Sequence, residues 1–391
     1  MSIHLSVALT DAGWHPAAWR HLPDRAAPFG PRYWVALAAE AERGTLDFVT
    51  IEDSPSLQSD RLDGPDGRTD RFRGRLDASL IAALVAPHTT RLGLVPTISG
   101  THTEPFHVAT ATATLDHVSS GRAGWRPQVA PRRTDADHYG RRDVPELRAD
   151  GLRDGTYAGH VTDLFTELGD VVEVVRRLWD SWQDDAVIRD VATGRYLDRD
   201  RLHYVDFTGR WFAVQGPSIT PRPPQGQPPV VALAHATVPY RFAAEHADVV
   251  LVTPRDADHA AELVAQVRSV EPKRETPLAI HADALVFVGD DAAERRHRLD
   301  DADGAETSSD AAILSGTPEH LADTLADWYA AGIAGFRLRP AVLPHDLTGI
   351  TRGLVPELRA RGLFRRAYEA DTLRGLLGLP RPANRYQRRT A

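Results

Sequence analysis

Two hydroxyl side chains and an arginine lie at the two ends of a strand, helix, strand pattern in the first third of the chain. Thr97 and Ser99 follow the apolar run 92–95 and begin a polar loop that extends to residue 105. An Ala- and Thr-rich helix is expected over 107–118, and the apolar run 121–125 leads into Arg126. Parallel α/β folds bind ligands at the carboxyl ends of their strands, so this loop is a candidate ligand site.

Arg126, His102 and His235 are the candidate catalytic residues. A strand-end arginine in a barrel points toward the mouth, where its guanidinium group could hold an anionic substrate through two parallel hydrogen bonds. The two histidines belong to a set of 17, and a lone histidine is more often structural than catalytic. No H-E-x-x-H motif or carboxylate spacing supports a metal site, so none is predicted.

Composition narrows the class of protein. The chain has no cysteine, which excludes disulfides, thiolate metal sites and cysteine nucleophiles, so redox chemistry would need a borrowed cofactor. The net charge of −8 is spread along the sequence without a basic block, so nucleic acid is not an expected partner. No apolar stretch is long enough to span a membrane, and the first residues lack the features of a secretion signal. A cytoplasmic location is expected.

Alternating strand and helix patterns must position these side chains. The expected strands lie at residues 3–9, 48–51, 92–95, 121–125, 230–233, 249–252, 278–288 and 336–338, and a helix pattern follows each of them. Strict alternation indicates a parallel sheet, and eight pairs favour a (β/α)8 TIM barrel. We predict one barrel domain over residues 1–391, with a lid-like insertion at 130–163, an irregular extended insertion at 183–229 and a charged excursion at 290–310.

Several motifs resemble one family along nearly the whole chain. They include HTTRLGLVPTIS (88–99), LDHVSSGRAGW (115–125), LWDSW (178–182), FAAEHADVV (242–250) and SGTPEHLAD (315–323). These motifs are similar to bacterial luciferase-like flavin-dependent monooxygenases, in the branch of nitrilotriacetate and dibenzothiophene sulfone monooxygenases. The resemblance implies an enzyme that receives reduced FMN from a separate flavin reductase and oxygenates a small organic substrate with O₂. It also implies a homo-oligomer.

The resemblance also implies where the cofactor binds. Asp53 matches a family carboxylate after the second strand, and Thr97 and Ser99 match hydroxyls after the third. Thr237 follows the fifth strand, where the family pattern Gln-Ala-Gly-x-Ser places a serine. Asp53, Thr97, Ser99 and Thr237 are therefore the predicted cofactor-binding residues.

Other ligand-facing positions depart from the family pattern. Arg126 stands where the family has the asparagine of Gly-Trp-Asn, and Arg337 replaces a second asparagine. Leu164 and Phe165 occupy the place of a basic residue and a tyrosine that help to hold phosphate, and His235 replaces a glycine. A histidine side chain prevents the close backbone approach to phosphate that glycine permits.

Three hypotheses follow from this combination of positions that match the family pattern and positions that depart from it. The first is a two-component FMN-dependent monooxygenase. The second is a relative that uses the deazaflavin F420, with arginines meeting its phosphate and polyglutamate tail. The third is a flavin-less barrel with a mouth rebuilt around Arg126 and His235, acting as a cofactor-free enzyme, a partner subunit or a binding protein. In each case the arginine could bind an anionic substrate.

Overall fold

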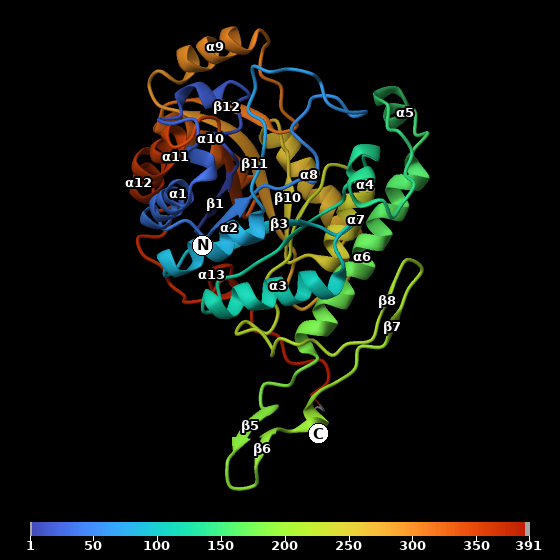
Figure 1. Ribbon diagram of the computed structural model, residues 1–391. Helices are drawn as coiled ribbons and strands as arrows, with labels where there is room; N and C mark the ends of the chain where they lie inside the picture. Colours follow the sequence, from blue (N-terminus) through green and yellow to red (C-terminus); the bar gives the residue numbers. More distant parts are fainter. Residues whose placement is uncertain (1, 388–391) are drawn as a thin grey trace.

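The computed structural model describes residues 2–387 and contains an eight-stranded parallel barrel (Figure 1). Its strands are β1 (His4–Leu9), β2 (Phe48–Ile51), β3 (Gly93–Ser99), β4 (Arg126–Gln128), β9 (Val231–Leu233), β10 (Val249–Val252), β11 (Ala279–Val288) and β13 (Gly335–Pro340). The strands are paired in the order β4-β3-β2-β1-β13-β11-β10-β9. A bridge between Trp125 and Val230 joins the two ends, so the sheet closes. The predicted barrel is confirmed.

Helices surround the barrel, and side chains cap the amino ends of some of them. They are α1 (Pro31–Arg43), α2 (Ala78–Val85), α3 (Pro105–Val118), α6 (Ala158–Asp180), α7 (Thr237–His246), α8 (Ala257–Val270), α10 (Pro318–Ala330), α11 (His345–Gly349) and α12 (Val355–Ala360). The Asp77 carboxylate accepts a hydrogen bond from the Leu80 N–H at 2.9 Å, and Thr317 caps α10 in the same way. Aspartate and threonine are among the residues that favour this position.

The last long helix differs from its prediction. The sequence predicts one helix over 347–361, but a π-helical turn (Ile350–Leu354) separates α11 from α12. At Gly349 an added Cβ atom would lie 2.8 Å from the Val288 Cβ atom, so the helix approaches β11 closely there. Pro356 has no N–H to continue the regular helical bonding, and a widened turn precedes it.

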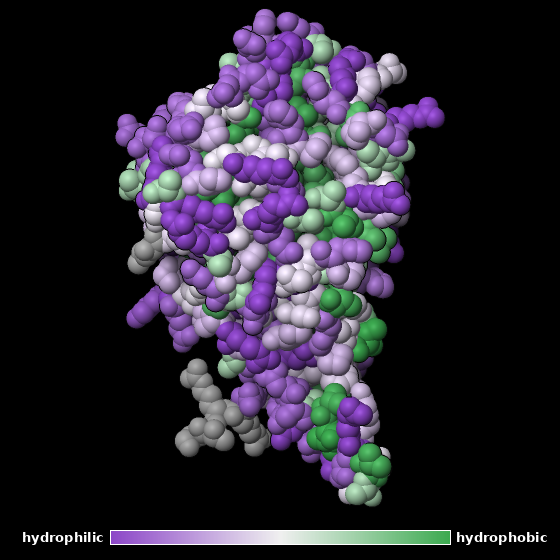
Figure 2. Space-filling model, turned by 90° about the vertical axis from the view of Figure 1, so that its left-hand side faces the viewer, coloured by the Kyte–Doolittle hydropathy of each residue, from purple (hydrophilic) through white to green (hydrophobic). Residues whose placement is uncertain are grey.

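The additional segments lie at both ends of the barrel. They contain α4 (Arg133–Tyr139), α5 (Ala149–Arg153), the hairpin β5 (Val187–Asp190) and β6 (Arg195–Leu197), the hairpin β7 (Phe207–Thr208) and β8 (Ala213–Val214), α9 (Ala292–Asp303) and β12 (Ala312–Gly316). The 3₁₀ turns are Ala18–His21, Ala27–Phe29, Ala86–His88 and Arg199–Arg201, and a short helix α13 spans Leu373–Leu376. The β5–β6 hairpin projects from the amino end of the barrel, and hydrophobic surface is visible on the projection (Figure 2).

Helix α9 was not predicted within the charged excursion. It buries Ala292 and Leu299 but otherwise consists largely of charged residues, so it lacks the apolar stripe that identifies a helix in sequence. After it, β12 pairs with the outer half of β11, from Ala284 to Val288. The excursion therefore returns to the sheet as an extra parallel strand at the carboxyl end.

The hydrophobic core lies between the barrel and its helices. Trp125, Trp179 and Trp328 are among the largest fully buried side chains. The inside of the barrel is different, because charged side chains of several strands meet there. Branched aliphatic residues usually fill such a barrel. No helix within residues 2–387 is long and apolar enough to cross a membrane.

Candidate active site

Six charged side chains form one layer inside the carboxyl half of the barrel. This charged layer consists of Glu52, Arg126, Asp283, Asp310, Arg337 and Arg339. Arg337 donates to both oxygens of Asp283 at 2.6 and 2.5 Å, and to Glu52 at 3.0 Å. Arg339 donates to Asp283 at 2.5 and 3.0 Å and to Asp310 at 2.5 Å. Three arginines therefore face three carboxylates, and the layer is neutral.

Ion pairing keeps this layer charged despite its burial. Burial raises the pKa of Asp283, but the neighbouring Arg337 and Arg339 outweigh burial and hold that pKa well below its usual range. The same balance, with Arg126 and Arg337, lowers the pKa of Glu52. Burial lowers the pKa of Arg126 to about 10, so its guanidinium group remains charged at neutral pH.

Arg126 has partners for its donors inside the layer. Its Nε donates to the Thr97 hydroxyl at 2.9 Å, and its NH2 group pairs with Glu52 and lies 3.2 Å from the Gln128 amide oxygen. The residue is 3% exposed. The guanidinium group that the sequence places at the barrel mouth is therefore bonded to neighbouring strands.

His235 lies at the other end of the same layer. Its Nε2 lies 3.3 Å from an Asp310 oxygen and its Nδ1 lies 3.1 Å from the Thr253 hydroxyl. Burial lowers the pKa of His235, against the raising influence of Asp310. The structure thus connects Arg126 and His235 through the charged layer, from Arg126 to Glu52 on one side and from Asp310 to His235 on the other.

The predicted cofactor-binding residues of β2 and β3 lie near the carboxyl ends of these strands, and Thr97 is bonded to Arg126 in the charged layer. Ser99 is paired in register with Gln128 of β4, two residues beyond the pair Thr97 and Arg126. The Ser99 hydroxyl is buried and has no hydrogen-bond partner among the described residues. The Asp53 carboxylate accepts from the Ser54 and Ala78 N–H groups at 2.7 and 2.9 Å, and burial raises its pKa. Ser99 is left with an unused hydrogen-bonding group.

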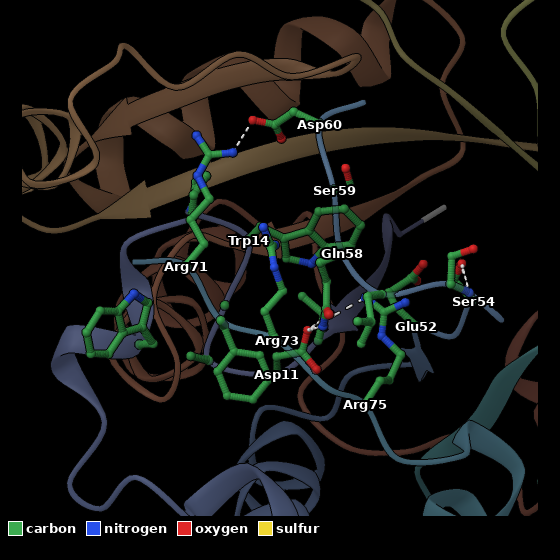
Figure 3. Close-up of a pocket in the computed structure, with 18 of the residues that line it drawn as sticks. Asp11, Trp14, Glu52, Ser54, Gln58, Ser59, Asp60, Arg71, Arg73 and Arg75 are labelled. Atoms are coloured by element: carbon green, nitrogen blue, oxygen red, sulfur yellow. Dashed lines mark hydrogen bonds and ion pairs between the residues drawn. The ribbon is translucent and has the colours of Figure 1, made fainter. Parts of the chain in front are cut away.

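A cavity of about 440 Å³ lies directly above the charged layer, and we call it the mouth cavity (Figure 3). Residues after β1, after β2 and after β4 line it, including Trp14, Glu52, Asp53 and Gln128. Residues 54–77, the mouth loop, cover it and supply nearly half of the residues in its wall. Three parallel strands thus contribute their carboxyl-end residues to one cavity, the expected place for a ligand.

The mouth loop is anchored to the charged excursion by ion pairs. Arg68 donates to the Asp303 carbonyl oxygen at 2.7 Å, and Arg71 donates to both Asp303 carboxylate oxygens at 2.9 and 2.6 Å. The Trp19 indole N–H donates to the Asp70 carbonyl at 2.9 Å. Segments far apart in the sequence therefore close over the same cavity.

His102 and Thr237 lie away from the mouth cavity. His102 stacks on Tyr139 with ring centroids 4.7 Å apart and lines a second cavity of about 610 Å³ beside α6. Burial lowers the pKa of His102, and its Nε2 has no partner in the described part of the chain. Thr237 is exposed at the first position of α7. These two predicted residues are not brought together with Arg126.

Sequence reasoning missed most of the charged layer. Asp283 lies within a long apolar strand, and Arg337 and Arg339 alternate in β13, so both arginines face the same side of the strand. A carboxylate inside an apolar strand and two arginines at a spacing of two were the available signals. Arg75, Gln58 and the other mouth-loop residues carry no such pattern.

The positions expected near a flavin phosphate are apolar in the structure. Phe165 packs against Phe242 with ring centroids 5.7 Å apart, and Leu164 is buried. Within residues 2–387, no group of three or more histidine, aspartate or glutamate residues could hold a metal ion. The expected cofactor site is therefore polar at Ser99 and Asp53, where the flavin ring is expected, and apolar at Leu164 and Phe165, where the phosphate is expected.

Comparisons with known proteins agree with this architecture. A family model described as luciferase-like monooxygenase matches residues 12–303. The N-acetyl-S-(2-succino)cysteine monooxygenase of Bacillus subtilis (strain 168) is 29% identical, with 98% of each chain covered. The nitrilotriacetate monooxygenase component A of Aminobacter aminovorans is 27% identical, with 95% of each chain covered. The crystal structure of a long-chain alkane monooxygenase superposes with a TM-score of 0.84 at 24% identity, covering 97% of this chain and 96% of that chain.

Proposed function

Because the chain belongs to the luciferase-like monooxygenase family, we propose that it oxygenates a small organic substrate with O₂ and reduced FMN. The membership confirms the resemblance that the sequence motifs predict. The relatives that match nearly end to end are named as monooxygenases, and one is named as component A. A component implies a second protein, which supports the proposal that a separate flavin reductase supplies the reduced cofactor.

The polar end of the expected site fits a flavin ring. The buried Ser99 hydroxyl has no partner among the described residues, and it lies beside the Gln128 amide on the neighbouring strand. A planar heterocycle with donors and acceptors at its edge would satisfy that hydroxyl, whose burial without a partner is costly. Ser99 and Gln128 would hold the ring edge, and Asp53 would face it from β2. Reduced FMN, when bound, supplies the electrons that activate O₂.

The remaining residues would orient the substrate and exclude water. The mouth loop closes the cavity from above, and the charged layer gives it a fixed floor. In a site closed to water, fixed charges act more strongly on bound groups than they do in solution. Burial raises the pKa of Asp53, so this carboxyl group at the cavity wall holds a proton more readily than an exposed aspartate does.

The Ser99 hydroxyl carries this proposal, and a binding titration tests it. We expect reduced FMN, added without oxygen, to bind the purified protein at micromolar concentration. Replacement of Ser99 by alanine should weaken binding about three- to ten-fold, the usual effect of one lost hydrogen bond. Ser59→Ala is the matched control, because its hydroxyl already donates to Gly64 within the mouth loop. No binding of FMN by the wild-type protein would refute the proposal.

The Phe165–Phe242 contact favours a second candidate, a barrel that uses F420 or no flavin. An aromatic pair cannot hold a phosphate, and Leu164 adds no charge there. Titration with F420 separates the possibilities: tight binding of F420 without FMN indicates the altered cofactor, and binding of neither indicates a flavin-less protein. The double variant Arg126→Asn and His235→Gly then tests whether these two residues exclude flavin. If they do, the variant should bind FMN more tightly than the wild-type protein does.

A further inference from the structure

Four arginines line the mouth cavity, and their bonding divides them into two pairs. Arg71 is bonded to Asp60 and Asp303, and Arg73 is bonded to Asp66. Arg75 and Arg132 also line the cavity, yet neither side chain donates a hydrogen bond to any described residue. The buried Nε of Arg75 therefore stands out as an unsatisfied donor, and the half-exposed Arg132 keeps its donors open to a ligand.

Arg75 is the better defined of the two (Figure 3). Its Nε is buried without a partner, and its NH2 group lies 3.6 Å from an Asp11 oxygen, beyond hydrogen-bond distance. The same Asp11 oxygen already accepts from the Gln58 amide at 2.9 Å and from Thr10 at 3.3 Å. Asp11 thus moderates the charge of Arg75 but leaves its guanidinium donors unused.

The other carboxylates of the cavity wall are engaged elsewhere. Glu52 pairs with Arg126 and Arg337, and Asp60 pairs with Arg71. Asp53 accepts two backbone N–H groups, and it lies near enough to Arg75 for the two charges to attract each other. Asp11 and Asp53 oppose the charge of Arg75, but neither accepts a hydrogen bond from its guanidinium group, so these donors remain open to a ligand.

We propose that the mouth cavity binds a substrate with a carboxylate or sulfonate group, held by Arg75 and Arg132. This inference rests on the proposed function, since it assigns a substrate class to the same site. A guanidinium group pairs with such oxyanions through two parallel N–H donors, and these bonds are stronger than neutral ones. Trp14, Trp19 and Phe72 in the same wall would contact the apolar part of the substrate.

Calorimetric titration with benzoate and its neutral isostere benzamide tests the assignment. We expect wild-type protein to bind benzoate at least about ten-fold more tightly than benzamide. Arg75→Gln should weaken benzoate about ten-fold or more and leave benzamide unchanged. Arg73→Gln is the matched control, because it removes the same charge from the same loop where Asp66 already pairs with it. Arg73→Gln should leave benzoate binding unchanged.

Three results would overturn the assignment. Equal binding of benzoate and benzamide means that no anion site exists, and equal losses in Arg75→Gln and Arg73→Gln mean that only overall charge acts. The third is a loss of FMN but not riboflavin affinity in Arg75→Gln, which would assign the arginine to the flavin phosphate instead. Should Arg75→Gln fail to fold, Arg132→Gln applies the same test from another segment of the chain.

The titrations are made without flavin, so the two proposals fail separately. Benzoate selectivity without FMN binding would refute the flavin-dependent function and keep the anion site. FMN binding without benzoate selectivity would refute the anion site and keep the flavin-dependent function.

Discussion

The charged layer and the mouth cavity lie one above the other, and they treat arginine in opposite ways. In the layer, each of the three guanidinium groups is bonded to a carboxylate. In the cavity wall, Arg75 and Arg132 donate to no described residue. Both regions contain arginine beside aspartate or glutamate, so composition alone does not distinguish them. The difference lies in whether the hydrogen-bonding capacity of each cation is already used.

A saturated arginine stabilises a fold, whereas an unsaturated one is available to a ligand. The desolvation of buried charges is offset only when their partners are well placed, and the loss of one partner leaves an uncompensated charge. Changes in the layer should therefore reduce stability, and changes in the cavity should reduce binding. The following predictions test that division, from the largest expected effect to the smallest.

Asp283→Asn should have the largest effect on stability. Asp283 is completely buried and bonded to both Arg337 and Arg339, so its neutralisation leaves excess positive charge inside the barrel. We expect the free energy of unfolding, measured by urea titration, to fall by about 3–5 kcal/mol. Asp63→Asn, which breaks an exposed pair with Arg61, is the control and should leave the free energy of unfolding nearly unchanged. A small loss for Asp283→Asn would contradict the structural role of the layer.

Arg126→Asn should cost less than Asp283→Asn. Glu52 would keep its bond to Arg337, so only the Arg126 contacts with Glu52, Thr97 and Gln128 are lost. We expect a decrease of about 1–3 kcal/mol in the same urea titration. Benzoate binding should not change, because Arg126 lies in the layer and not in the cavity wall. A large decrease in benzoate affinity would indicate that Arg126 contacts the ligand.

His281→Gln should alter the pH dependence of stability. Burial lowers the pKa of His281 to about 3, whereas an unfolded histidine titrates near 6.5. Between these values the unfolded chain binds one more proton, so stability falls as pH falls through this window. At pH 4.5 the protonation of His281 in the unfolded chain should cost the wild-type protein about 2–3 kcal/mol of stability. The non-titrating variant should not show this loss. Parallel pH profiles of the two proteins would contradict this expectation.

The smallest expected effect concerns the flavin phosphate. Leu164 and Phe165 carry no charge that could bind the phosphate group. FMN and riboflavin should therefore bind with affinities within about three-fold of each other. Leu164→Arg combined with Phe165→Tyr should then create a preference for FMN. Fluorescence titration with both flavins measures this, and a strong wild-type preference for FMN would show that a phosphate site exists elsewhere.

The barrel could be predicted from sequence because each strand and helix has its own periodicity. The same reasoning missed α9, whose stability comes from contacts with the rest of the fold and not from an apolar stripe. It identified Arg126 as an unusual strand-end cation but could not find its partners. Glu52 is 74 residues away in the chain, and only the register of the strands brings the two together.

The ligand-facing arginine was harder to find than the structural one. Arg75 lies in a loop rich in arginine, aspartate and glycine, where nothing in the sequence separates paired from unpaired side chains. The distinction depends on which carboxylates lie within bonding distance after folding. Local patterns carry no information about that distance.

The bonds that hold the mouth loop closed have a consequence for the rate of ligand entry. Arg68 and Arg71 attach this loop to Asp303, and the Arg71 and Asp303 side chains are only 10% and 4% exposed. Dissolved salt screens a buried ion pair far less than an exposed one. Raising the salt concentration should therefore leave this attachment, and with it the access of ligand to the cavity, largely unchanged.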